Sequence, residues 1–345
     1  MSWIKNISIV ALSIACTLTL VELVFRQLEL GYGNSPLEQS PKYHHIHPKN
    51  YSFRMHDPNG EYGGHMVFYD AFGLRTINAT DDVDRTRLRS DAIIFLGDSF
   101  TEANQVNYEQ SFVYLAGKEF SRPVLNFGVS SYSPLIYLIQ AQHQLPSFAG
   151  STVIIQLFSN DFYDDAAYER LAIYENGIIQ GIDGGDPNWI TKFLRQSYLL
   201  RFLRKAQLTI QTSLSRKSPI SKDIGETSFV FEQSIESAAI DASVNVLKTI
   251  QSILDRQHKK MLVIMIPSKY LTKRNSCCND DALYKTVKDK LRQSGITFID
   301  VAEEFEQSVD QTKLFFGNDI HLTVAGHEAI MNAIVKHEYF TRQTQ

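Results

Sequence analysis

A serine stands where a predicted strand ends, in the tripeptide Gly97-Asp98-Ser99. The apolar run Ala92–Leu96 before it predicts a buried strand, and the residues after it predict a turn into a helix. A serine in that place exposes its hydroxyl, and the first backbone N–H groups of the helix have no intrahelical acceptor. Because Gly-Asp-Ser also occurs in plain turns, the motif alone does not identify a nucleophile.

A carboxylate and a histidine lie near the end of the chain, in Asp319-Ile320-His321. A serine hydroxyl is a poor nucleophile at neutral pH and needs an adjacent base, for which His321 is the candidate. Asp319 is placed to hold the imidazole tautomer and to stabilise the imidazolium. The structural alternative for Asp319 is the N-cap of the final helix. We expect the nearby His327 to be structural.

The composition is that of a globular protein with a substantial core. The chain has 345 residues, 43% of them hydrophobic and 21% charged, which suits one large α/β domain with additions or two small domains. A net charge of -4 gives no support for nucleic-acid binding as the main task. No residue cluster requires a metal or an organic cofactor.

The N-terminus predicts a membrane helix within residues 1–30. Between Ile7 and Phe25 the only charged residue is Glu22, and the run is long enough to cross a hydrocarbon core of roughly 30 Å. A buried core helix is the alternative, and the missing small-x-small site argues against a cleaved signal peptide. The flanking Lys5 and Arg26 do not fix the orientation, so an extracytoplasmic domain is inferred from the chemistry alone.

Residues 31–65 are rich in Gly, Pro, Asn, Tyr and His and predict a loop-dominated linker. A metal site and a set of surface histidines both fit its five histidines, and we favour the second because their spacing matches no ligand pattern. These histidines are His44, His45, His47, His56 and His65.

From residue 91 onward, short apolar runs alternate with helical patterns, which predicts a doubly wound α/β sandwich. Several runs are apolar throughout, as in parallel strands covered on both faces. The predicted strands are 92–96, 124–127, 152–158, 261–266 and 297–301, and the predicted helices are 110–120, 135–144, 235–257 and 280–294. The active site of such a fold lies at the carboxyl ends of the strands.

A long insertion, at about 162–234, separates the third strand from the fourth. Its stretch from Trp189 to Lys222 is basic, has no acidic residue and is interleaved with Phe and Leu. One interpretation is an amphipathic helix on an anionic membrane surface. The other, which we favour from sequence, is a helical lid packed on the domain with a solvated basic face.

Four ordered blocks resemble those of the SGNH (GDSL-type) hydrolase superfamily. They are Gly97-Asp98-Ser99, Asn126-Phe127-Gly128-Val129-Ser130, Ser159-Asn160-Asp161 and Asp319-Ile320-His321-Leu322-Thr323. The resemblance covers roughly residues 65–338 and includes Phe72-Gly73-Leu74-Arg75, which looks like a segment upstream of the serine in anchored members. It implies an SGNH hydrolase-like domain over residues 66–345, built as a three-layer α/β/α sandwich with a five-stranded parallel, flavodoxin-like sheet.

The resemblance also assigns roles to individual residues. It implies Ser99, His321 and Asp319 as the catalytic residues and the Ser99 N–H, the Gly128 N–H and the Asn160 amide as the oxyanion hole. Many members place the acid three residues before the histidine, where this chain has Asn318. The Asp-x-His spacing found here resembles relatives involved in polysaccharide acetylation.

Three functions fit these features. The first is a membrane-anchored serine esterase that removes acyl groups, in particular acetyl groups, from an envelope carbohydrate through an acyl-Ser99 intermediate. The second is an O-acyltransferase that moves such a group onto a polysaccharide, with a membrane acyl-donor protein as a partner. The third is a non-catalytic carbohydrate-binding protein, which we rank last because all five site residues are present.

Overall fold

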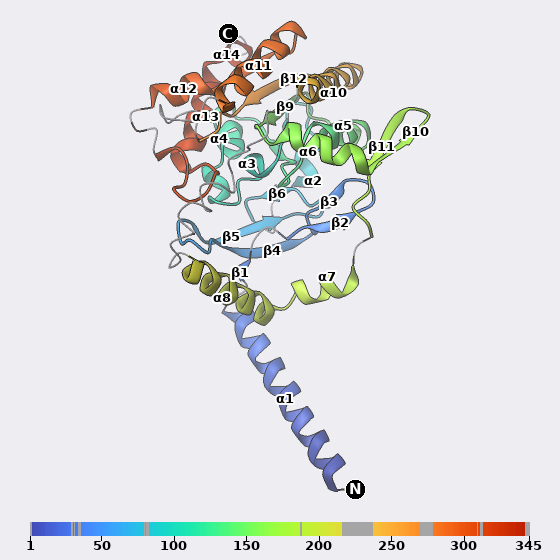
Figure 1. The fold of residues 1–345 in the computed structure, drawn as a ribbon, viewed down its shortest axis with the longest axis vertical. Coiled ribbons are helices and arrows are strands. Elements are labelled where there is room, and N and C mark those ends of the chain that lie inside the picture. The colour runs from blue at the N-terminus through green and yellow to red at the C-terminus, as the bar shows by residue number, and fades with distance from the viewer. Residues whose placement is uncertain are drawn as a thin grey trace.

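The computed structural model describes residues 2–28, 30, 32–33, 36–78, 80, 83–186, 188–215, 237–269, 279–308, 310 and 313–341. An α/β body carries a long N-terminal helix, α1 (Ser2–Gln27), that projects away from it (Figure 1). Within the described residues, α1 is the one helix long and apolar enough to cross a membrane.

The five predicted strands are present and form the parallel part of the central sheet. They are β7 (Ile93–Leu96), β8 (Val124–Asn126), β9 (Thr152–Leu157), β12 (Lys260–Met265) and β13 (Phe298–Asp300), in the order β8-β7-β9-β12-β13. All four neighbouring pairs are parallel, so the flavodoxin-like strand order is confirmed. Strands β7 and β9 are fully buried, which explains their uninterrupted apolar sequences.

Helices cover both faces of this sheet, which confirms the three-layer sandwich. Along β7, Ile94 and Leu96 face one core and Ile93 and Phe95 face the other, as the alternation of a strand requires. The first core is closed by α5 (Pro134–His143), α10 (Ser237–Arg256) and α11 (Asn279–Gln293). The second is closed by α4 (Phe112–Glu119), α12 (Val301–Gln307) and α13 (Val324–Lys336). The remaining short helices are α2 (Val83–Thr86), α3 (Ser99–Glu102) and α14 (Glu338–Thr341).

The sheet continues beyond β8 into the N-terminal region, where the sequence predicted mostly loops. Strands β6 (Arg75–Thr76), β5 (Gly63–Tyr69), β4 (Tyr51–His56) and β1 (Tyr32–Gly33) extend it, and β2 (Glu38–Ser40) pairs with β3 (His44–Ile46). Strands β4 and β5 enclose a small core of Phe53, Met55, Val67 and Tyr69. Residues 31–65 therefore contain β1 to β4 and the start of β5 and are not a loop-dominated linker, because alternate apolar side chains of β4 are buried even though the segment is polar overall.

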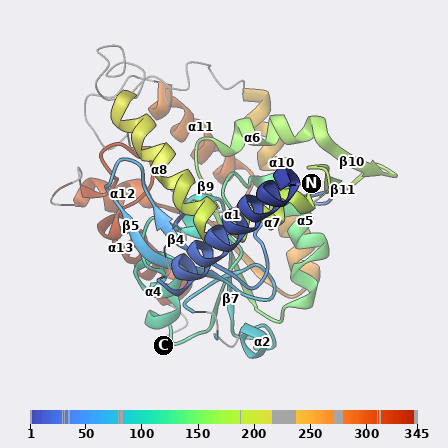
Figure 2. The same ribbon diagram turned by 90° about the horizontal axis from the view of Figure 1, so that it is seen from below.

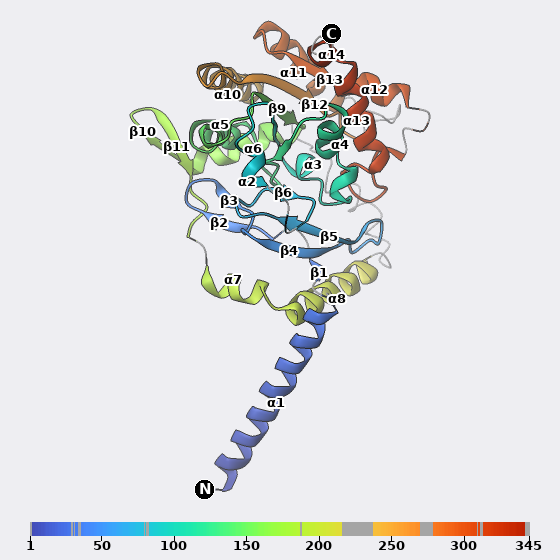
Figure 3. The same cartoon turned by 180° about the vertical axis from the view of Figure 1, so that it is seen from behind.

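The insertion after β9 is helical only in part. It contains α6 (Asp161–Tyr168), the hairpin of β10 (Ala172–Glu175) and β11 (Ile178–Ile182), α7 (Trp189–Arg195) and α8 (Tyr198–Ser215). Residues 216–236 lie outside the described residues. Figure 3 shows α7 and α8 below β4 and β5, between the body and α1.

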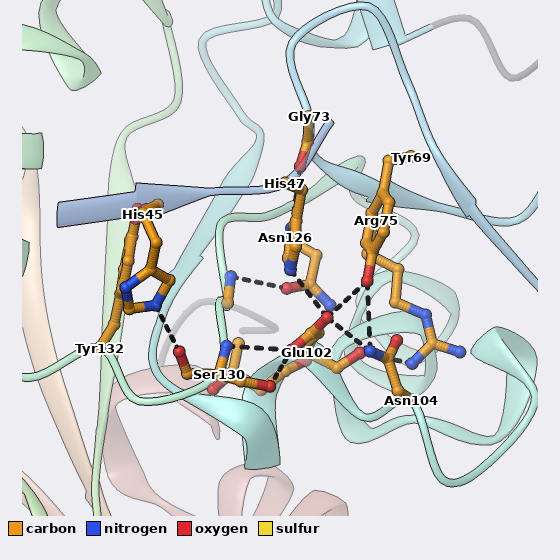
Figure 4. Close-up of polar contacts among 12 residues, drawn as sticks. His45, His47, Tyr69, Gly73, Arg75, Glu102, Asn104, Asn126, Ser130 and Tyr132 are labelled. Carbon is orange, nitrogen blue, oxygen red and sulfur yellow. Dashed lines mark hydrogen bonds and ion pairs between the residues drawn. The ribbon is translucent and has the colours of Figure 1, made fainter. Parts of the chain in front are cut away.

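A buried carboxylate joins this N-terminal region to the helix that follows Ser99 (Figure 4). Glu102, the last residue of α3, is fully buried and accepts hydrogen bonds from the Tyr69 hydroxyl at 2.5 Å and from the Ser130 N–H at 2.9 Å. His47 Nε2 lies 2.7 Å from Glu102 Oε1 in a buried ion pair. The Arg75 guanidinium donates to the carbonyl oxygens of Glu102 and Val106.

The prediction that the histidines of residues 31–65 lie on the surface is wrong for two of them. His47 and His45 are buried, and His45 Nε2 lies 2.7 Å from the Ser130 carbonyl oxygen. The physical reason is that both imidazoles find polar partners inside the protein, which offsets the cost of leaving water. Among the described residues, no group of three or more metal-ligating side chains is placed to hold a metal ion.

The charge of Glu102 is maintained by its neighbours. Burial alone raises the pKa of this carboxyl, but the charge of His47 and the hydrogen bonds from Ser130 and Tyr69 lower it well below its ordinary value. A depressed carboxyl pKa stabilises the folded state above the pKa of the unfolded chain, and this stabilisation is lost as the pH falls towards the folded-state pKa.

We predict that Glu102→Gln lowers the free energy of unfolding by about 3 kcal/mol at neutral pH, because it leaves a buried histidine without its counter-charge. The difference from the unsubstituted protein should shrink below about pH 4.3, where the carboxylate of the unfolded chain becomes protonated. Urea unfolding at several pH values measures both effects. Glu119→Gln, at an exposed position on α4, is the matched control. An equal loss of unfolding free energy at every pH would show that the effect does not come from the charge of Glu102.

Candidate active site

Ser99 is the first residue of α3 and follows the carboxyl end of β7. Asp98 caps the helix and accepts the Phe100 N–H at 2.8 Å, while its own N–H donates to Gln156 Oε1 at 3.0 Å. A side chain at Gly97 would place its Cβ 2.0 Å from Thr101 Oγ1, so the tight entry into α3 requires glycine here. The Ser99 N–H is in the first turn, where backbone donors have no intrahelical acceptor.

The structure brings His321 to Ser99. His321 Nε2 lies 2.7 Å from Ser99 Oγ, across 222 positions of sequence. The imidazole sits in the loop before α13, where Phe316 and Thr323 form backbone hydrogen bonds across the loop. Its ring centroid is 5.2 Å from that of Phe100. By contrast, His327 is buried in α13 against Phe112, and burial lowers its pKa to about 3, as fits a structural residue.

Asp319 occupies the other side of the imidazole. Its Oδ1 lies 2.5 Å from His321 Nδ1 and also accepts the His321 backbone N–H at 2.9 Å. Its Oδ2 accepts the hydroxyl of Tyr62 at 2.6 Å. Burial alone raises the pKa of Asp319, but the bonds and charge of His321 and the bond from Tyr62 lower it well below its ordinary value. The carboxylate is therefore held in its charged form.

Asn318, at the position where many relatives carry the acid, points elsewhere. Its backbone N–H and its side-chain amide both donate to the Glu61 carboxylate, at 2.9 and 3.0 Å. Lys269 Nζ donates to carbonyl oxygens of the same loop, those of Phe316 at 2.8 Å and Asp319 at 3.3 Å. The loop that carries Asp319 is thus fixed from two sides.

Gly128 lies in the loop after β8, where the structure gives it a packing role. A Cβ there would lie 2.4 Å from the Glu102 nitrogen and 2.7 Å from the Thr101 carbonyl carbon, so a larger residue would push the loop away from α3. The Gly128 N–H donates to Asn126 Oδ1 at 2.9 Å. Its part in an oxyanion hole stays a prediction, because in this structure the single N–H is directed to Asn126.

Asn160 lies after β9, at the same edge of the sheet as Ser99. Its side-chain amide donates to Asp164 Oδ2 at 2.7 Å. An amide carries two N–H groups, so this bond engages one of them, and the part of Asn160 in an oxyanion hole stays a prediction. The surroundings are acidic: burial raises the pKa of Asp164 to about 6, and burial raises the pKa of Asp98 to about 7.

This arrangement contains the parts that nucleophilic acyl transfer needs. A hydroxyl, an imidazole and a carboxylate are connected in series by contacts of 2.7 and 2.5 Å. Candidate oxyanion donors from the start of α3 and the end of β9 lie at one edge of the sheet.

Sequence reasoning missed the residues that support the acid. Tyr62 and Glu61 come from the segment predicted as linker, 257 positions before the loop they contact. The signal that favours ordered structure there is the alternation of Tyr51, Phe53 and Met55 in β4. That pattern predicts a strand, but it does not predict which distant loop the following turn touches.

We predict that Asp319→Asn lowers kcat by about 10³- to 10⁴-fold, because an amide cannot stabilise the imidazolium of His321. Asn318→Ala is the neighbouring control and should retain most of the turnover, because its amide donates to Glu61 and not to His321. Steady-state turnover of an acetyl ester measures both. Full turnover by Asp319→Asn together with an impaired Asn318→Ala would reverse the assignment.

We also predict that Tyr62→Phe lowers kcat/KM by about ten- to a hundredfold, because a hydrogen bond to a charged group contributes about 1.5–3 kcal/mol. Without the hydroxyl, the pKa of Asp319 is less depressed, so the variant should also be less stable at neutral pH. Its difference in stability from the unsubstituted protein should shrink below about pH 3.9, where the carboxylate of the unfolded chain becomes protonated. Urea unfolding at several pH values measures this effect. Tyr114→Phe, on α4, is the control, and equal stability of Tyr62→Phe and the unsubstituted protein at neutral pH would contradict the proposed support of Asp319.

Comparison with known proteins gives a family match over part of the chain. Residues 227–341 match the family model described as SGNH hydrolase-like domain, acetyltransferase AlgX. No curated protein matches the chain.

Three solved structures illustrate the structural likeness, each at 12% identity. LAE5, an α/β hydrolase enzyme from the metagenome of Lake Arreo, Spain, has a TM-score of 0.43 over 72% of this chain and 95% of its own. Axe2, an acetylxylan esterase from Geobacillus stearothermophilus, has a TM-score of 0.42 over 73% and 95%. The lipase/acylhydrolase from Enterococcus faecalis has a TM-score of 0.43 over 73% and 96%. The family match covers the last third of the chain and includes the fourth of the predicted motifs, Asp319-Ile320-His321-Leu322-Thr323, so this part of the chain is similar to an SGNH hydrolase-like domain.

Proposed function

We propose that this protein is a serine enzyme that acts on ester-linked acyl groups through an acyl-Ser99 intermediate. The observation that carries the proposal is the series of contacts from Ser99 Oγ through His321 to Asp319, at 2.7 and 2.5 Å. The chemistry of such a series follows from its members. The base activates a weak nucleophile, and the buried carboxylate stabilises the cation that forms on the base.

In the first half of the proposed reaction, Ser99 Oγ attacks the ester carbonyl carbon while its proton passes to His321 Nε2. The carbonyl oxygen becomes an oxyanion, for which the Ser99 N–H and the Asn160 amide are the proposed donors. The tetrahedral intermediate then collapses, the ester C–O bond breaks, and the alcohol leaves with the proton from Nε2. In the second half, an incoming hydroxyl loses its proton to Nε2 and attacks the acyl carbon. The bond between that carbon and Ser99 Oγ then breaks, and Oγ takes back the proton from Nε2.

We favour an O-acetyl group on an envelope carbohydrate as the substrate, with water as the acceptor. An anchored domain outside the cytoplasm would have direct access to such polymers, and α1 is the candidate anchor. The Asp-x-His spacing resembles relatives involved in polysaccharide acetylation. No cofactor is needed for this chemistry.

Transfer of the acetyl group to a polysaccharide hydroxyl is the second candidate. Its specific support is the match of residues 227–341 to a domain described as an acetyltransferase. The two candidates share every step up to the acyl-enzyme and differ in whether water or a sugar hydroxyl attacks it. In the transferase, a membrane acyl-donor protein is an expected partner. A non-catalytic binding protein on the same fold ranks third, because it leaves the contact between Ser99 and His321 without a use.

The test is acetyl release from a chromogenic acetyl ester by the full chain in detergent, with and without an oligosaccharide acceptor. We predict that Ser99→Ala reduces kcat by at least about 10⁴-fold. Loss of the nucleophile removes the contribution of all three catalytic residues, because His321 and Asp319 act only through it. Ser252→Ala, on the exposed side of α10, is the matched control. Free acetate alone supports the esterase, and acetylated oligosaccharide supports the transferase. A folded protein without turnover and without fluorophosphonate labelling at Ser99 would favour the binding protein.

A further inference from the structure

Two helices of the insertion lie across the point where α1 meets the body. They are α7 and α8, and together with their connection we call residues 189–215 the α7–α8 layer. Figures 1 and 3 show this layer between α1 and the strands β4 and β5, and Figure 2 shows it from below on the same face as α1. The layer is therefore the part of the body nearest to the candidate membrane helix.

Glu22 of α1 holds the first turn of α8. Its carboxylate accepts the backbone N–H groups of Tyr198 and Leu199, both at 3.0 Å, and the hydroxyl of Ser197 at 2.9 Å. These N–H groups have no acceptor within their own helix, so Glu22 acts as the cap of α8 from another helix. The lone acid in the apolar run thus has a structural partner in the insertion.

Two further contacts fix the same junction. The Arg26 guanidinium lies 5.0 Å from the ring centroid of Tyr198, and the rings of Phe25 and Phe202 meet edge to face at 5.0 Å. Together with the cap, they fix where α8 leaves the end of α1.

The position of Glu22 sets the depth of the layer. A rise of about 1.5 Å per residue places Glu22 about 30 Å along α1 from Ser2, which is the thickness of a bilayer's hydrocarbon core. If α1 spans the membrane, Glu22 lies where the hydrocarbon ends, and α8 starts at that boundary.

The layer exposes an apolar face at this level. On α8, the exposed residues Leu200, Leu203, Ile210 and Leu214 follow one another on a single side of the helix, at the spacing of an amphipathic stripe. On α7, Trp189 is 75% exposed and Phe193 69%. Apolar side chains of this size, gathered on one face, mark an interaction surface.

The other side of α8 contacts the body. His56 Nε2 lies 3.0 Å from Thr209 Oγ1, and Arg201 donates to the Ser52 carbonyl oxygen at 3.3 Å. Since Thr209 and Arg201 lie away from the stripe of Leu203 and Ile210, the apolar stripe faces away from the sheet. The helical segment packed on the domain that we favoured from sequence is thus present, but its outward face carries apolar side chains as well as basic ones.

The charge of the layer matches an anionic surface. Residues 189–215 contain five basic side chains and no acidic one. Two of them, Arg195 and Arg201, bond to the body, whereas Arg204 is exposed beside the apolar stripe. A helix with an apolar stripe and basic side chains is the kind that lies in the headgroup region of a bilayer.

We propose that the α7–α8 layer lies in the interface of the anionic membrane that α1 crosses. Its apolar stripe enters the lipid, the exposed Arg204 beside the stripe meets the lipid phosphates, and its other side, which includes Arg201, holds the body. The protein is then fixed to the membrane at a helix and at a surface. This proposal rests on α1 as a membrane helix and is independent of the chemistry at Ser99.

The test uses the full chain in vesicles of phosphatidylcholine and phosphatidylglycerol. The chain has two tryptophans, Trp3 and Trp189, so Trp3→Phe leaves Trp189 as the only one. We predict about a twofold loss of its emission when the lipid carries bromine near the ester end of the acyl chain, since interfacial helices sink about 5–10 Å into that region. The matched control combines Trp3→Phe and Trp189→Phe with Ile178→Trp, in the exposed β10–β11 hairpin away from the layer (Figure 1).

The outcomes separate the alternatives. Quenching at position 189 but not at position 178 supports the proposal. Unquenched, blue-shifted emission from Trp189 means that protein covers the layer. Unquenched, red-shifted emission means that water covers it. Either result overturns the proposal. A chain that fails to float with the vesicles overturns the anchor as well. None of these results depends on turnover, so a failure here is distinct from a failure of the proposed esterase.

Discussion

The buried charge of Glu102 is the constraint on which the arrangement of the active site depends. A carboxylate without solvent is tolerated only where charge and hydrogen bonds surround it, and here those partners come from three separate segments. His47 follows β3, Tyr69 ends β5, and Ser130 lies in the loop after β8. The carboxylate itself ends the helix that Ser99 begins. Glu102 in the nucleophile's helix therefore has all of these partners only when the N-terminal region is packed on the α/β body.

The same residue links two parts of the candidate site. Ser130 donates to Glu102 with its backbone N–H and its hydroxyl, and it stands two positions after Gly128 in the loop that the resemblance assigns to the oxyanion hole. The Glu102 nitrogen would be the nearest atom to any side chain at position 128. Helix α3 and this loop are thus fixed to each other by a charge-assisted contact and by a close approach that only glycine permits. Exclusion of a side chain at 128 is therefore explained by packing alone, whichever group binds the oxyanion.

The sequence predicted the parallel core and the strand-end motifs, but not the N-terminal sheet. Runs such as Thr152–Leu157 are fully buried and uninterrupted, so their composition alone reveals them. Strand β4 buries one face only, and its alternation of Tyr51, Phe53 and Met55 is obscured by the polar residues around it. The contact of Tyr62 with Asp319 follows from tertiary packing, and no local pattern in either segment encodes it.

The contact between Tyr62 and Asp319 explains the Asp-x-His spacing. Because the acid stands two residues before His321, a single oxygen, Oδ1, accepts both the ring Nδ1–H and the backbone N–H of the histidine. The second oxygen is then left for an outside donor, and Tyr62 supplies it at 2.6 Å. An acid at position 318 would lie where the backbone N–H already donates to the Glu61 carboxylate. The short spacing therefore depends on the N-terminal region, which supplies the donor for the second carboxylate oxygen of Asp319. The turn after β4 provides the Tyr62 hydroxyl, which helps to keep Asp319 charged, and the Glu61 carboxylate, which holds the neighbouring Asn318 and so fixes the loop.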